Sequence, residues 1–275
     1  EAYCETGKPT FSLGFSEPAA GSDNMNMSCV TKKQADGTYL LNGQKTWVTQ
    51  GAAFPNILVV SKDEDPSREN KSMSMWLVPL ETKGLTTAPL HKIGQQIMPF
   101  CEVYFDDVVL TEDMRVGEEG KGFYNLMKNF ETERCLIVAQ AIGVAQAAMD
   151  DAAAYVSERM TFGKPLANYQ LIQLKLVEME TAIQNSRNML YKTLWKMDNG
   201  ESVRIDSALL KRYACQEATK VASEAMQIYG GLGFTTETRI GRLWADLRGF
   251  QIAGGTDEIM VYIAGRQLAK QYARK

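Results

Sequence analysis

The chain has 275 residues, which is enough for one large domain or two ordinary ones. Hydrophobic residues make up 45% of it and charged residues 23%, a composition typical of globular proteins. The net charge is −3 and no short run of lysines and arginines occurs, so the charge pattern argues against a nucleic-acid partner.

The rare residues narrow the possible chemistry. Five cysteines are scattered along the chain without a Cys-x-x-Cys pair, which fits a reducing, cytoplasmic location and argues against a disulfide framework. The single histidine, His91, excludes a two-histidine metal site within one chain and argues against a Ser-His-Asp triad. We therefore expect no metal, and chemistry carried by carboxylates, hydroxyls or a bound cofactor.

Neither a leader nor a membrane span is expected. Glu1 is not followed by a basic segment and an apolar segment, as a signal peptide would require. The most apolar long stretch, residues 135–149, contains Gln140 and Gln146 and is too polar for a membrane span.

The first part of the chain has the pattern of short strands. Apolar runs occupy residues 39–41, 57–60, 73–78, 103–105 and 108–110, with turn signals such as Asp36-Gly37 between them. Strands at this spacing, with no helical segments between them, predict an antiparallel sandwich or barrel. No G-x-G-x-x-G or Walker loop supports a Rossmann domain here.

After Gly122 the hydrophobic period becomes that of helices. Helices are predicted at residues 123–159, 166–197, 205–229, 239–248 and 257–272. The predicted fold is α+β, with an antiparallel β-barrel or sandwich domain at residues 1–117. A four-helix-bundle domain follows at residues 118–275.

Two segments of the first domain could contact a ligand. Ser16–Asp23 combines hydroxyls with small residues that would let backbone N–H groups approach an anion, although an ordinary solvated turn has the same composition. Trp47 and Thr49 alternate on a strand and would offer an indole face beside a hydroxyl to a flat ring. The alternative for Trp47 is a core position.

Glu133 is the most informative residue of the helical part. It lies within the apolar stripe of the first long helix, between Phe130 and Ile137, and no cation stands at its i±4 positions. Burial would raise the pKa of such a carboxylate toward the range of a general base. A partner from another helix, or a stripe edge open to water, is the alternative.

Seven short motifs in chain order resemble the acyl-CoA dehydrogenase family. They are Ser-Glu-Pro-x-x-Gly-Ser-Asp at 16–23, Asn-Gly-Gln-Lys-x-Trp-x-Thr at 42–49, Phe-Asp-Asp-Val at 105–108, Glu-Arg at 133–134, Arg-x-Thr-Phe-Gly-Lys at 159–164, Gln-Ile-Tyr-Gly-Gly-x-Gly at 227–233 and Gly-Gly-Thr-Asp-Glu at 254–258. The last motif and residues 265–272 most resemble the crotonobetainyl-CoA reductase-like branch.

The resemblance implies an FAD site in the first domain. Leu13, Phe15 and Ser16 would line the flavin, with Ser16 hydrogen-bonding the ring, and Trp47 and Thr49 would flank it.

A second set of residues would reach the FAD of a neighbouring subunit, which implies a homodimer, usually assembled as a homotetramer. These residues are Arg159, Thr161, Phe162, Gln170, Gln227, Gly230 and Gly231. Thr256 and Glu258 match adenosine-side FAD contacts, although many relatives have glutamine in place of Glu258.

The substrate implied by the resemblance is an acyl-CoA thioester. Four residues match positions along the CoA arm: Ser22, Glu131, Arg134 and Gly255. Ser22 would also contact the flavin.

Two departures from the family pattern matter. Most members carry the catalytic glutamate at the position of Gly254, whereas a minority resembling the isovaleryl and long-chain enzymes carry it at the position of Glu133. Glu133 is therefore expected to remove the α-proton while a hydride passes to flavin N5, with the Gly254 N–H holding the enolate oxygen. The other departure is that the family's N-terminal helical domain is expected to be missing from this chain.

The implied function is an FAD-dependent acyl-CoA dehydrogenase of fatty acid or carnitine metabolism that passes electrons to an electron-transfer flavoprotein. One alternative is an enoyl-CoA reductase running in the reverse direction. Another is a non-catalytic FAD- or CoA-binding relative, and a third is an oxidase that produces hydrogen peroxide.

Overall fold

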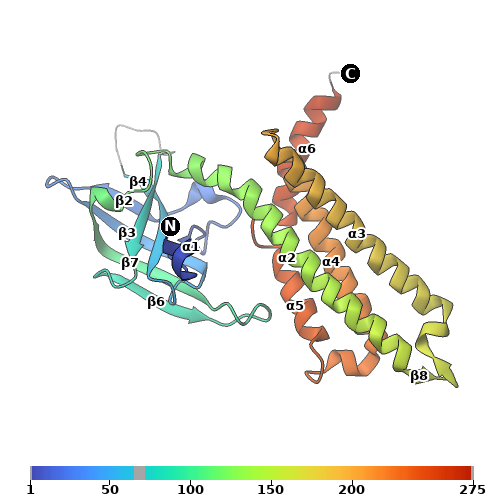
Figure 1. Ribbon diagram of the computed structural model, residues 1–275. Helices are drawn as coiled ribbons and strands as arrows, with labels where there is room; N and C mark the ends of the chain where they lie inside the picture. The colour runs from blue at the N-terminus through green and yellow to red at the C-terminus, as the bar shows by residue number, and fades with distance from the viewer. Residues whose placement is uncertain (1, 65–71, 274–275) are drawn as a thin grey trace. The chain divides into compact units, whose positions relative to one another are not determined.

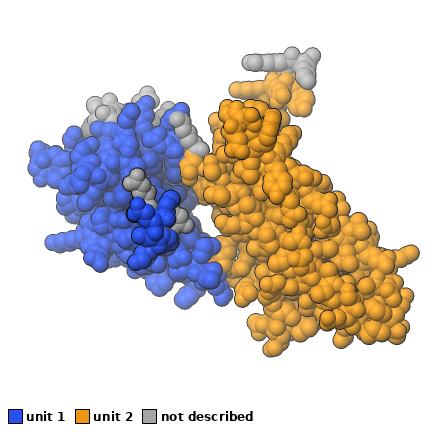
Figure 2. All heavy atoms as spheres, viewed as in Figure 1, with its two compact units in different colours: residues 1–92, 96–128 blue, residues 93–95, 129–275 orange. Residues whose placement is uncertain are grey.

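The structure, a computed structural model, describes residues 2–64 and 72–273. The chain forms two compact units, coloured separately in Figure 2. Unit 1 comprises residues 1–92 and 96–128, and unit 2 comprises residues 93–95 and 129–275. Each unit has its own hydrophobic core, which is what a chain of this length and composition requires.

Unit 1 is built on a seven-stranded sheet with the order β1-β4-β2-β3-β7-β6, in which β5 pairs with β4 (Figure 1). A short helix, α1 (Ala2–Thr6), precedes it, and two 3-10 turns follow β1 and β7 (Asn24–Asn26 and Glu112–Met114). The strands are β1 (Ser12–Gly14), β2 (Val30–Lys33), β3 (Tyr39–Thr49), β4 (Asn56–Asp63), β5 (Met73–Pro79), β6 (Leu85–Leu90) and β7 (Phe100–Leu110).

The sheet corrects the expectation of purely antiparallel pairing. Strands β1 and β2 both pair with β4 in parallel, while the remaining pairs are antiparallel, and the described strands form no closed barrel. The strands at residues 12–14, 30–33 and 85–90 were not predicted. Their sequences are short, polar or interrupted by Pro89, which lies on an edge strand where a missing N–H is tolerated.

Unit 2 is helical, as the periodicity predicts. Its helices are α2 (Gly122–Glu158), which begins in unit 1, α3 (Gln170–Asp198), α4 (Arg204–Tyr229), α5 (Ile240–Phe250) and α6 (Asp257–Tyr272). The connection after α2 is a small hairpin of β8 (Met160–Thr161) and β9 (Lys164–Pro165), followed by a 3-10 turn (Leu166–Asn168). A further 3-10 segment, Gly230–Phe234, follows α4.

Small side chains let the central helices approach closely. Ala141, Ala145 and Ala148 of α2 and Ala214 and Ala222 of α4 are all buried in one cluster. Burial of this stripe is the main source of stability for unit 2, since each helix alone would be marginal in water.

Among the described helices, α2 alone is long and apolar enough to cross a membrane. This differs from the expectation based on Gln140 and Gln146. That criterion rests on length and composition only. Because residues such as Val138, Ala145 and Ala152 pack into the core of unit 2, burial in protein accounts for the composition.

Two glycines of unit 1 separate the effect of backbone conformation from that of crowding. Gly43 has φ +136°, and a Cβ there would lie 2.6 Å from Cys29 Cα; Gly37 has φ +89° and open space around it. We expect Gly37→Ala to lower the free energy of unfolding by about 1 kcal/mol through strain alone. Gly43→Ala should cost at least about 2 kcal/mol more, because backbone must also move. Urea unfolding of both variants measures this, and equal losses would contradict it.

Candidate active site

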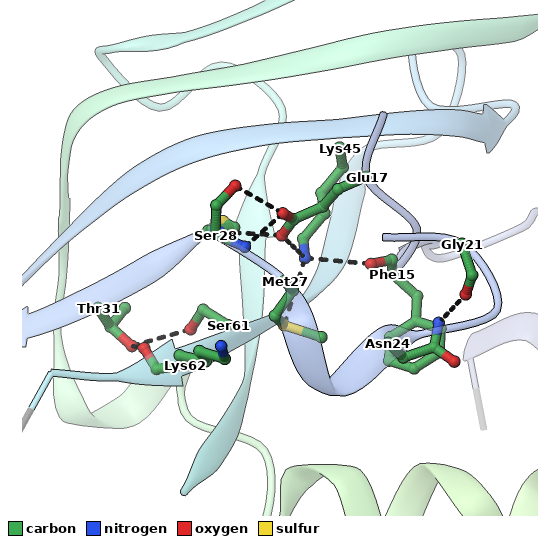
Figure 3. Close-up of polar contacts among 11 residues, drawn as sticks. Phe15, Glu17, Gly21, Asn24, Met27, Ser28, Thr31, Lys45, Ser61 and Lys62 are labelled. Atoms are coloured by element: carbon green, nitrogen blue, oxygen red, sulfur yellow. Dashed lines mark hydrogen bonds and ion pairs between the residues drawn. The ribbon is translucent and has the colours of Figure 1, made fainter. Parts of the chain in front are cut away.

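A buried ion pair organises the loop and strand that carry the first set of predicted residues. Lys45 of β3 is fully buried, and its Nζ donates to Glu17 Oε1 at 2.8 Å and to Phe15 O at 3.1 Å (Figure 3). The Cys29 N–H donates to the same Glu17 oxygen at 2.9 Å, and Ser28 donates to Glu17 Oε2 through both its N–H and its hydroxyl.

These partners determine the ionisation of Glu17. Burial by itself would raise the pKa of the Glu17 carboxyl, but the Lys45 ammonium and the Ser28 donors outweigh it and hold the pKa below its usual value. Neither Glu17 nor Lys45 was singled out from the sequence. The sequence did contain a signal for both residues. Glu17 is a charged residue in a loop of small residues, and Lys45 is a charged residue within a strand.

The ion pair places the loop beside the end of β3. The Thr46 N–H donates to Ser16 O at 2.9 Å, so the segment carrying Leu13, Phe15 and Ser16 runs along the segment carrying Trp47. The predicted flavin-lining residues of unit 1 are therefore brought together. Phe15 is buried, whereas Leu13 and Ser16 are half-buried and Ser22 is exposed on the same loop.

Trp47 is not a core residue, which rules out the structural alternative for it. The pairing of β3 with β7 shifts between Lys45 and Val48, and Trp47 lies in that bulge with φ +58° and 58% of its surface exposed. A tryptophan with a left-handed backbone conformation and an exposed indole costs free energy, and such residues are characteristic of functional sites. Thr49, two residues further, is half-buried.

The hydroxyls of this region are available to a ligand. Within the described parts of the chain, the side chains of Ser16, Ser22 and Thr49 have no hydrogen-bond partner. An exposed indole flanked by unengaged hydroxyls is an arrangement that could hold a flat heteroaromatic ring.

A second candidate site lies in unit 2, where α2 meets the loop before α6. Gly254 has φ +64°, and a Cβ built on it would lie 3.9 Å from Glu133 Oε1 and only 2.4 Å from Ile137 Cδ1. Glu133 and Gly254 are far apart in the sequence but thus lie close together in space. Any side chain at 254 would be strained by this backbone conformation and would require Ile137 Cδ1 to move.

Glu133 is half-buried, and burial raises the pKa of its carboxyl while the neighbouring Arg134 partly opposes this. No described residue forms an ion pair or hydrogen bond with it. The alternative of a cationic partner from another helix is therefore not found. A carboxylate that is desolvated and unpaired has the properties of a general base.

Arg134 is buried, and desolvation lowers its pKa while Glu131 and Glu133 oppose the shift. Its Nε has no hydrogen-bond partner in the described structure. Glu131 is half-buried.

The loop 254–258 ends in a helix cap. Thr256 Oγ1 accepts from the Ile259 N–H at 3.3 Å, which makes Thr256 the N-cap of α6, and Glu258 is exposed on the first turn of that helix. Lys211 of α4 donates to Gly255 O at 2.6 Å. Lys211 was missed from the sequence, although its place in a buried helical stripe marks it in the same way as Glu133.

The remaining predicted residues gather at one end of unit 2. The rings of Tyr155 and Tyr229 stack with centroids 4.2 Å apart, which holds the end of α4 against α2. Phe162 is 96% exposed and has φ +46°. The others, all exposed or half-exposed at the surface, are Arg159, Thr161, Gln170, Gln227, Gly230 and Gly231.

The two units match two consecutive domains of one family. Residues 12–108 match the description "Acyl-CoA dehydrogenase, middle domain", and residues 120–269 match "Acyl-CoA dehydrogenase, C-terminal domain". The chain belongs to the acyl-CoA dehydrogenase family. It is accordingly an oxidoreductase of that family, with the mixed-sheet and helical domains described above.

Individual acyl-CoA dehydrogenases agree with this assignment. The probable acyl-CoA dehydrogenase YdiO of Escherichia coli strain K12 is 45% identical over the whole chain, which covers 72% of that protein. The butyryl-CoA dehydrogenase of Megasphaera elsdenii is 35% identical, with a TM-score of 0.90 over 94% of this chain and 68% of its own. An acyl-CoA dehydrogenase of Slackia heliotrinireducens is 38% identical, with a TM-score of 0.88 over 100% of this chain and 70% of its own.

The buried ion pair yields a stability prediction. Lys45→Met should lower the free energy of unfolding at neutral pH by about 3–5 kcal/mol, because it leaves the Glu17 carboxylate buried without its cation. The wild-type contribution of Glu17 is fully present above its unfolded-state pKa and is lost as the pH falls through the lower folded-state value. The deficit of the variant should therefore shrink in acid, where Glu17 becomes protonated.

Urea unfolding near pH 7 and in acid tests this. The control is Lys32→Met, which removes an exposed ion pair with Glu64 and should cost less than about 1 kcal/mol. A Lys45→Met loss no larger than that of the control would contradict the prediction.

Proposed function

We propose that this chain is the catalytic part of an FAD-dependent acyl-CoA dehydrogenase that uses Glu133 as its base. The observation that carries the proposal is the convergence of Glu133 and Gly254, because a Cβ at 254 would lie 3.9 Å from Glu133 Oε1. The two alternative positions of the family's glutamate thus serve one location. The chain has a carboxylate at one of them and, at the other, a glycine whose φ of +64° disfavours any side chain.

The residues of unit 1 fit a flavin. The bulged, exposed indole of Trp47 supplies a flat face, and the unengaged hydroxyls of Ser16 and Thr49 supply groups for ring heteroatoms. Leu13 and Phe15 would line the ring, and Thr256 and Glu258 would meet the adenosine side. When bound, FAD supplies the acceptor for the hydride that leaves the substrate's β-carbon.

The chain's own residues handle the proton and the thioester. Glu133 takes the α-proton, which its unpaired and partly desolvated carboxylate is suited to do. The Gly254 N–H has no acceptor among the described residues and is therefore available to the substrate. It donates to the thioester oxygen as negative charge develops there. Ser22, Glu131, Arg134 and Gly255 would contact the CoA arm.

A second copy of the chain would complete the cofactor site, giving a homodimer that assembles as a homotetramer. The strained and exposed Phe162 supports this, since a phenyl ring that is 96% exposed is best explained by a partner surface. Arg159, Thr161, Gln170 and the segment at Gln227–Gly231 would join it at the same end of unit 2. We further propose a domain boundary between residues 117 and 118, which lies between the two family matches.

The electron acceptor proposed for the reduced enzyme is an electron-transfer flavoprotein in the cytoplasm. The experiment that tests the function is an anaerobic visible spectrum of the FAD-loaded protein before and after saturated acyl-CoAs, including a carnitine-type thioester. Bleaching of the flavin band by one of them is the expected result. A flavin band that no saturated thioester bleaches would contradict it and favour the reductive direction or a non-catalytic relative.

The base assignment predicts the effect of one substitution. Glu133→Gln should retain FAD and its absorption but lose substrate-driven bleaching by about a thousandfold or more in rate, since Glu133 is the carboxylate that faces Gly254. Asp150→Asn, an exposed position on the same helix, is the matched control and should bleach at the wild-type rate. Retained bleaching by Glu133→Gln would remove Glu133 from the mechanism.

The ionisation of Glu133 predicts a pH dependence. The base must be deprotonated, and its pKa is raised by burial. The rate of flavin reduction should therefore fall as the pH is lowered through a value above the ordinary glutamate pKa. Stopped-flow reduction rates across the pH range measure this apparent pKa, and an inflection at or below the ordinary glutamate value would contradict the prediction.

A further inference from the structure

The loop that carries Gly254 is held from behind by a buried lysine. Lys211 of α4 is fully buried, and its Nζ donates to Gly255 O at 2.6 Å and lies 3.8 Å from Asp257 Oδ1. A lysine is rarely found fully buried, because the ammonium loses its hydration and must be compensated by partners. These two partners lie on either side of Thr256.

Asp257 in turn depends on Lys211. It is the first residue of α6, and its Oδ2 accepts from Gln216 Nε2 at 2.9 Å. Its Oδ1 is buried and has no hydrogen-bond partner in the described part of the chain, so the ammonium at 3.8 Å is the compensating charge. The pair costs desolvation that a neutral, apolar contact would not, which suggests that it serves position rather than stability.

The backbone between these contacts cannot fix its own shape. Gly254 and Gly255 have φ of +64° and +94°, and glycine is the residue with the most conformational freedom. Two hydrogen bonds restrain it: Lys211 Nζ donates to Gly255 O, and the Asp257 N–H donates to Gln251 O at 3.2 Å. Neither the Gly254 N–H nor the Gly255 N–H donates to another described group.

We propose that Lys211 is a positioning residue that holds the Gly254–Gly255 turn so that the Gly254 N–H meets the thioester oxygen above Glu133. The proposal rests on the function proposed above. Lys211 is fully buried and would act through Gly255 O. A donor that must bind developing charge is effective only when its direction is fixed beforehand, and a turn of two glycines would otherwise adopt many directions.

The test measures stabilisation of an enolate without turnover. Acetoacetyl-CoA is bound to the FAD-loaded protein, and the ultraviolet absorbance of its enolate is titrated with pH to give an apparent enolisation pKa. The variant is the double substitution Lys211→Met and Asp257→Asn, which removes the donor to Gly255 O without leaving a buried unpaired carboxylate. Asp257→Asn alone is the matched control, because it keeps that donor.

The wild-type protein should lower the enolisation pKa of the bound thioester below that of free acetoacetyl-CoA. The double variant should raise it by about one unit or more, a tenfold loss in the enolisation constant, while the single variant should change it by less than half as much. Both variants should retain the flavin spectrum. This readout would not change if Lys211 served stability alone.

Each other outcome overturns one specific claim. A folded, FAD-loaded double variant with the wild-type enolisation pKa would overturn the role of Lys211. A double variant that does not fold would also overturn it, by making Lys211 a residue of the fold. If the wild-type protein itself fails to enolise the thioester, the proposed function fails first.

Discussion

The ammonium of Lys45 joins three parts of unit 1 that would otherwise be independent. It lies on β3, neutralises Glu17 from the loop after β1, and donates to the carbonyl of Phe15. Glu17 passes the restraint on to the start of β2 through the N–H groups of Ser28 and Cys29. Through these contacts the loop lies against the bulge of β3, and that bulge leaves the indole of Trp47 exposed instead of in the core.

In unit 2, Lys211 and Glu133 are charged side chains within apolar helical stripes, and they differ in whether they have a partner. Lys211 is buried with a carbonyl and a carboxylate as partners, and it fixes a loop. Glu133 is partly buried without any partner, and desolvation shifts its pKa toward reactivity. The contrast illustrates how one helical pattern, a charge within an apolar stripe, can produce either a structural restraint or a reactive group. The deciding factor is whether a second element supplies a countercharge.

The sequence predicted the helical unit well because long helices bury a stripe with a regular period, and α2, α4 and α6 begin and end within two residues of expectation. It predicted the sheet less well. Val30–Lys33 is stabilised by pairing on both sides and not by its own side chains, so its polar sequence gives no strand signal. The parallel pairing of β1 with β4 depends on contacts distant in sequence.

The candidate site shows the same division. Glu133 could be identified from its neighbours at i−3 and i+4, because α2 is regular. Trp47 could not be assigned between core and ligand, since the bulge that exposes it requires the pairing with β7. The support of Gly255 by Lys211 crosses 44 positions, which no local pattern reports.

The crowding around Gly254 also bears on how such an enzyme can change. A glutamate introduced there would start from an unfavourable backbone conformation, with its Cβ 2.4 Å from Ile137 Cδ1 and 3.9 Å from Glu133 Oε1. A glutamate at 254 beside Glu133 would therefore require Ile137 Cδ1 to move and would bring two carboxylates close together. The left-handed backbone at Gly254, together with Ile137, thus favours a carboxylate at one of the two positions and not at both.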